Sequence, residues 1–77
     1  MKLKPVGSNM TELVIGHTRI MFSYSTPVAG QDDKGLFRTA QHYSSTTSRH
    51  INKYLEGKNV GRVVPQSYID GLVGGSA

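Results

Sequence analysis

The sequence predicts an α+β fold: a small antiparallel sheet of about four strands, one main helix packed on it, and a short C-terminal helix. Residues 10–40 contain short apolar and β-branched runs separated by turn-forming residues, which is typical of antiparallel strands. After residue 44 the apolar spacing lengthens from every second residue to every third or fourth, which indicates a helix. The 77 residues suffice for one compact domain, expected over 1–73, with a flexible tail over 74–77.

The first hairpin is predicted from two strand-favouring runs, MTELVI at 10–15 and TRIMFSYS at 18–25. The link between them, Gly16-His17, has two residues, and tight hairpin turns of that length prefer glycine because they require positive φ. We therefore expect two antiparallel strands joined by a tight turn.

The core is predicted from the alternation in the second of these strands. Side chains alternate across a strand, so Ile20, Phe22 and Tyr24 share one face while Met21 lies on the other. The first face is expected to pack against the main helix. The predicted core residues are Ile20, Phe22, Tyr24, Ile51 and Leu55.

A second hairpin is predicted from residues 26–30 and 36–40, which flank the turn-forming cluster QDDKG at 31–35. Pro27 lacks an amide proton, so it ends the ladder or places its strand at an edge of the sheet. With the first hairpin, this pair brings the expected number of strands to about four.

The main helix is predicted over residues 47–56. The hydroxyl-rich run at 44–48 offers side-chain oxygens that can cap the first amides, and Gly57 is suited to end the helix in the left-handed conformation. A helix N-terminus of this kind also attracts phosphate, so both capping and anion binding remain open at 44–48.

Two further elements are expected before the tail. Val63-Val64 can add a short strand, and Pro65 suits the first turn of a short helix over 66–73. Gly71 weakens that helix.

The basic charge is concentrated in the middle of the chain. Residues 34–62 contain six Lys or Arg residues and one Glu, a net charge of +5, whereas the whole chain carries +4. Phosphates bind such a segment because counterion release favours the complex, and interleaved aromatic rings can stack on bases. The alternative is a solvated face that keeps a small protein soluble. The candidate residues for binding nucleic acid or another partner are Arg38, His42, Tyr43, Arg49, His50, Lys53, Lys58 and Arg62.

The motifs of several other functions are missing from the sequence. His17, His42 and His50 lack the spacing of a metal site and no cysteine joins them, so we expect neither a metal nor a cofactor. No G-x-S-x-G elbow is present, and a binding protein is expected rather than an enzyme. No run reaches the roughly 18–20 apolar residues of a membrane span, so the protein is expected to be soluble and cytoplasmic, with no membrane partner.

Five stretches together resemble a family of small uncharacterised domain proteins encoded by tailed bacteriophages: MKLKPVGSNMTEL, FSYSTPVA, FRT, YSSTTSRHINKYLEG and VPQSYIDGLV. The resemblance spans nearly the whole chain. It implies a phage origin and a place of action in the host cytoplasm, and it carries no activity to transfer onto particular residues.

These observations support two hypotheses about function. The first is a phage-encoded accessory protein that binds DNA or RNA, or a nucleic-acid-processing or defence complex of the host, without catalysis. The second is a virion or assembly component that self-associates, and a homodimer is compatible with either.

Overall fold

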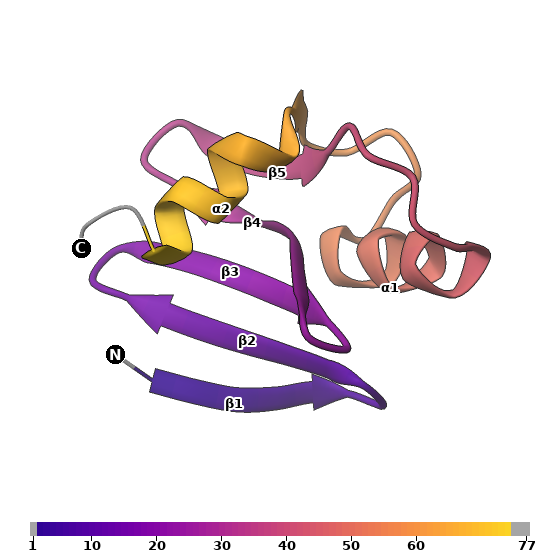
Figure 1. The fold of residues 1–77 in the computed structure, drawn as a ribbon, viewed down its shortest axis with the longest axis horizontal. Helices are drawn as coiled ribbons and strands as arrows, with labels where there is room; N and C mark the ends of the chain where they lie inside the picture. The colour runs from indigo at the N-terminus through magenta and orange to yellow at the C-terminus, as the bar shows by residue number, and fades with distance from the viewer. Residues whose placement is uncertain (1, 75–77) are drawn as a thin grey trace.

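The short strand-forming runs fold into a six-stranded sheet with two helices in the computed structural model, which describes residues 2–74 (Figure 1). The order of the strands in the sheet is their order in the chain. β1 to β5 form an antiparallel meander, and β6 pairs with β5 in parallel. The elements are β1 (Lys2–Gly7), β2 (Met10–Ile15), β3 (Thr18–Ser23), β4 (Thr26–Asp32), β5 (Gly35–Thr39), α1 (Ser45–Leu55), β6 (Arg62–Val64) and α2 (Gln66–Gly74).

The prediction of about four antiparallel strands is wrong, because β1 and β6 extend the sheet at its two edges and β6 makes it mixed. β1 contains Lys2, Lys4 and Pro5, and its residues 2–5 are exposed. Such residues are tolerated on an edge strand, where one row of backbone amides has no neighbour to pair with. β6 follows a crossover through α1, the kind of long connection that parallel pairing requires.

The three turns that connect β2 to β5 differ in how well they match the prediction. Gly16 has φ 59, as the predicted tight turn requires. The β3–β4 connection is also a two-residue turn, in which Tyr24 has φ 58 and 56% of its surface is exposed. The predictions that Tyr24 belongs to a strand and to the core are therefore wrong. The β4–β5 turn is shorter than predicted, because the strands continue to Asp32 and restart at Gly35.

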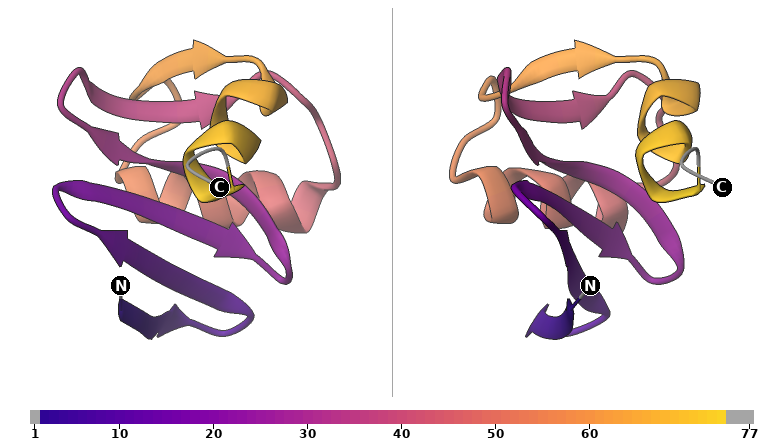
Figure 2. Two further views of the ribbon diagram at one scale, coloured as in Figure 1. Left: turned by 60° about the vertical axis from the view of Figure 1, so that its left-hand side comes forward. Right: turned by 90° about the vertical axis from the view of Figure 1, so that its left-hand side faces the viewer.

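The central strands are buried on both faces, because α1 covers one face and α2 the other (Figure 2). On the α1 side Met21 is fully buried and packs with Ile51 and Leu55, so its predicted place on an outer face is wrong. On the α2 side Ile20 packs with Phe37, Val64 and Ile69, and Phe22 lies against this cluster. The predicted core thus combined residues of two separate layers.

The helix ends follow local chemistry. Ser44 caps α1, and its Oγ accepts a hydrogen bond from the Thr47 amide at 3.1 Å. At the other end Glu56, rather than the predicted Gly57, takes the left-handed conformation with φ 61. Gly57 is needed for a different reason, because a Cβ there would lie 2.5 Å from Val60 Cγ2.

The short helix predicted over 66–73 is α2, which ends at Gly74. The rest of the predicted tail, 75–77, lies outside the described residues. Within 2–74, no helix is long and apolar enough to cross a bilayer.

Candidate functional site

Arg38 holds the end of α1 in place. From β5 its guanidinium donates three hydrogen bonds: Nε to Val60 O at 2.8 Å, Nη1 to Asn52 Oδ1 at 3.1 Å and Nη2 to Gly57 O at 2.8 Å. All three nitrogens are occupied within the fold, so the side chain is preorganised. Its positive charge remains part of the local electrostatic field, but this arginine has little freedom to follow a ligand.

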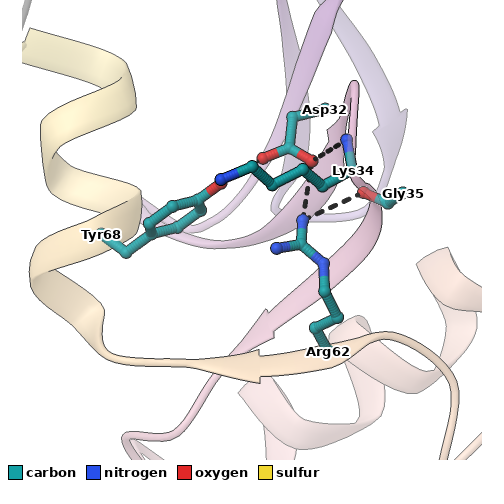
Figure 3. A network of polar contacts seen from close by, with 5 residues as sticks. All are labelled: Asp32, Lys34, Gly35, Arg62 and Tyr68. Atoms are coloured by element: carbon teal, nitrogen blue, oxygen red, sulfur yellow. Dashed lines mark hydrogen bonds and ion pairs between the residues drawn. The ribbon is translucent and has the colours of Figure 1, made fainter.

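Arg62 belongs to a different cluster, between the β4–β5 turn and α2 (Figure 3). Its Nη2 donates to Asp32 Oδ1 at 2.7 Å, and its guanidinium lies 6.0 Å from the Phe37 ring centroid and 5.9 Å from that of Tyr68. Asp32 offsets the charge of Arg62, and their contact ties β6 to β4.

Asp32 accepts several hydrogen bonds in this cluster. Its burial alone would raise the pKa of the carboxyl, but the Tyr68 hydroxyl, the Lys34 amide and the Arg62 charge outweigh burial and lower the pKa below its ordinary value. The carboxylate is therefore ionised at neutral pH, and the guanidinium of Arg62 offsets its negative charge.

A pocket of about 280 Å³ lies between α1 and the segment that leaves β5. Three predicted site residues line it: Arg38, His42 and Lys58. Ser48 and Asn52 contribute polar groups from α1. Among the described residues that line the pocket, none is an Asp or Glu, so its chemistry suits an anion. The lining residues are Arg38, Thr39, Ala40, Gln41, His42, Ser48, Ile51, Asn52 and Lys58.

Beside this pocket, α1 carries two exposed basic side chains, Arg49 and Lys53. They lie one helical turn apart and project from the same side of the helix, opposite the buried Ile51 and Leu55. Tyr43, in the segment before α1, is also exposed, with 43% of its surface accessible.

His50 lies on the other flank of α1 and contacts β3. Its Nδ1 is 2.7 Å from Ser23 Oγ, which is 3.1 Å from Thr47 Oγ1. The Tyr24 ring lies 5.7 Å from the His50 ring, tilted by 43°. Although a Ser–His contact can activate a nucleophile, Ser23 is 98% buried, since only 2% of its surface is accessible, and a substrate cannot reach its hydroxyl.

Tyr54, an aromatic residue of the same basic segment, anchors α1 to β2 instead of facing a ligand. Its hydroxyl donates to Glu12 Oε2 at 2.6 Å, and Lys4 Nζ lies 3.8 Å from Glu12 Oε1. Burial and the Glu12 carboxylate raise the pKa of Tyr54 well above its ordinary value. The phenol therefore stays protonated and remains a donor.

Sequence reasoning missed Tyr24 as a surface residue and treated Arg38 and Arg62 as equivalent to Arg49. The signal for Tyr24 was available: Tyr24-Ser25 is a two-residue link followed by Thr26-Pro27, which suggests a turn. For Arg38 and Arg62, no neighbouring residue in the sequence indicates that the side chain is bound within the fold. Within residues 2–74, no group of three or more His, Cys, Asp or Glu residues is placed to hold a metal ion.

The family to which the chain belongs follows from its sequence. Residues 1–71 match the family of unknown function DUF8033. The chain belongs to this family. The DUF8033 match extends from β1 into α2 and so includes the pocket and α1. It confirms the expected small uncharacterised domain family, and its description assigns no activity. Neither the curated proteins nor the solved structures contain a match to the chain.

Proposed function

We propose that this protein binds nucleic acid without catalysis, through the pocket and the exposed side of α1. The observation that carries the proposal is the pocket itself, where Arg38, His42 and Lys58 converge and no described lining residue is acidic. Phosphate groups match this combination of fixed guanidinium, imidazole and flexible ammonium, together with hydroxyl and amide donors.

The charge distribution supports the same surface. Within residues 2–74 the structure shows two ion pairs, Lys4–Glu12 and Arg62–Asp32, and both lie away from the pocket. Arg49, Lys53 and Lys58 take part in neither pair. Their charges are therefore free to attract a polyanion, and the attraction is strongest at low salt because counterion release depends on salt concentration.

The sequence resemblance to phage-encoded domains supports a role as an accessory protein in an infected host cell. The proposed target is DNA or RNA, free or held in a host processing or defence complex, in the host cytoplasm. The buried Ser23 beside His50 supports binding over hydrolysis, because the contact has no access for a substrate.

The test removes the positive charges of Arg49 and Lys53, which are exposed and belong to neither ion pair. Arg49→Gln with Lys53→Gln should weaken the binding of oligonucleotides and leave the melting temperature nearly unchanged, because exposed charges contribute little to stability. The slope of log affinity against log salt should flatten by about 1.4 units for a single strand, or about 1.8 units for a duplex, on loss of two phosphate contacts.

The matched control removes the same charge elsewhere. Lys2→Gln with Lys34→Gln changes two exposed lysines, on β1 and in the β4–β5 turn, and should leave the salt dependence close to that of the wild type. Wild-type protein that binds neither duplex nor single-stranded oligonucleotides at ~50 mM salt would overturn the proposal, because non-specific contacts are strongest there.

A second candidate function, self-association in an assembly, is favoured by one observation. β6 is an edge strand of the sheet, and its residue Val63 is 67% exposed. Light scattering after size-exclusion chromatography should show a concentration-dependent assembly if this edge pairs with another copy, and Val63→Lys should dissociate it. A monomer at all concentrations would exclude this candidate.

A further inference from the structure

Tyr24 adopts an unfavourable backbone conformation at an exposed turn. Its φ of 58 is left-handed, where an L-residue with a bulky side chain is disfavoured. The neighbouring hairpin turns use residues that tolerate this conformation, Asn9 with φ 60 and Gly16 with φ 59. Strain of this kind concentrates at binding and active sites, where a side chain must be held in one place.

The strained backbone of Tyr24 holds its aromatic ring at the surface, where the ring is accessible to solvent. Tyr24 is 56% exposed, yet its amide is held by a hydrogen bond to Asn9 O at 2.8 Å. Its ring contacts the imidazole of His50, which Ser23 in turn holds from within the sheet. The ring is therefore positioned before any ligand arrives, so stacking on it costs little conformational entropy.

The ring reaches α1 through its contact with His50, on the same helix as the exposed Arg49 and Lys53. Lys53 lies three residues after His50 and four after Arg49, so it is a neighbour of both on the helix surface. Phosphates held by Arg49 and Lys53 would leave their bases within reach of Tyr24. Alternation of cations with an aromatic ring is how proteins bind single strands.

We infer that Tyr24 and His50 form a base-stacking platform, and that the nucleic acid bound is single-stranded. This inference rests on the proposed function and specifies its ligand. In a duplex both faces of each base are covered by neighbouring bases, so only unpaired bases can stack on an exposed aromatic side chain. The chemistry is common to single-stranded DNA and RNA.

The test compares oligonucleotides that carry bases with one that carries none. The probes are a labelled oligothymidylate, an oligouridylate of the same length, and an abasic strand with the same number of phosphates. Tyr24→Gly should weaken binding of the base-bearing strands by about 5- to 150-fold, the loss expected for one stacked base, and leave binding of the abasic strand unchanged. Comparison of the two base-bearing probes shows whether DNA or RNA is preferred.

Two variants separate the loss of the ring from the change of the backbone. Tyr24→Phe keeps the aromatic ring and should retain wild-type affinity. Asn9→Gly relieves the same left-handed conformation in the neighbouring turn and should also bind as the wild type does. The melting temperature of Tyr24→Gly should equal or exceed that of the wild type, because glycine suits the turn.

The outcomes distinguish this inference from the proposed function. If Tyr24→Gly binds the base-bearing and abasic strands equally more weakly, or binds both as the wild type does, the stacking platform is overturned while nucleic-acid binding stands. Wild-type protein that binds none of the probes and no duplex would overturn both.

Discussion

Arginines that look alike in the sequence have different roles in the fold. Arg38 donates to three acceptors around the end of α1, whereas the exposed Arg49 lies on the outer side of the helix. Arg38→Ala should lower the free energy of unfolding by about 2–4 kcal/mol, because hydrogen bonds to a charged group contribute strongly and two carbonyls lose their donor. Urea denaturation measures this loss. Arg49→Ala is the control and should change stability by less than about 0.5 kcal/mol, and equal effects would contradict the structural role of Arg38.

Asp32 makes stability depend on pH in the acid range. Because its folded pKa lies below the ordinary value of 3.8, its ionised form stabilises the fold above that pH, and the contribution is lost as pH falls through 3.8 to the folded pKa. Asp32→Asn should therefore be less stable than the wild type at pH 7, and the difference should shrink towards pH 3. Denaturation at both pH values measures it.

Asp33 supplies a matched control for the loss of a carboxylate in this turn. It is the next residue in the same turn, and it is exposed. Asp33→Asn should leave the stability at pH 7 within about 0.5 kcal/mol of the wild type, because an exposed substitution away from the cluster changes stability little. A constant difference between Asp32→Asn and the wild type at all pH values would show that the Asp32 carboxylate does not titrate as the cluster requires.

At the scale of the secondary-structure elements, the hydroxyl groups at the N-terminus of α1 have two candidate roles, helix capping and anion binding. The Ser44 Oγ already accepts the Thr47 amide, so the hydroxyl is committed to the helix. Ser44→Ala should lower the free energy of unfolding by about 0.5–2 kcal/mol, as loss of an N-cap does, whereas the exposed Ser45→Ala should have a smaller effect. Chemical denaturation gives both values. Unchanged stability of Ser44→Ala with weaker binding of oligonucleotides would instead favour an anion site.

At the scale of the whole molecule, the sheet has a core on each face. Leu55 is 4% exposed on the α1 side and Ile69 is fully buried on the α2 side. Leu55→Ala and Ile69→Ala should each cost about 2–5 kcal/mol, because each leaves a cavity in a separate layer. For a domain of this size the melting temperature should fall by about 4–8 °C per kcal/mol.

The two layers share the strands between them, so both variants should unfold in one transition followed by circular dichroism and by tyrosine fluorescence. Two transitions would show that the layers unfold independently. A fall of less than about 4 °C in Leu55→Ala would contradict the core position of Leu55.

Local sequence signals were sufficient for several elements. Gly16 predicted the first tight turn, the hydroxyl-rich run predicted the capped start of the helix, and the helical spacing of Ile51 and Leu55 predicted its buried side. These features depend on residues close together in the chain, where backbone conformation and side-chain period are decided by neighbours.

The sequence by itself therefore determined the first hairpin turn, the main helix and the concentration of basic charge. Only the tertiary structure decided that β1 joins the sheet and that the strand expected at Val63-Val64 pairs with β5 in parallel. It also decided that Met21 is as buried as Ile20, and that Arg38 is bound internally while Arg49 is exposed. The physical reason is that a period of two separates the faces of a strand but does not say how many layers cover them. Likewise, the sequence does not show which hydrogen-bond acceptors an arginine side chain will meet, because folding brings them from residues distant in the chain.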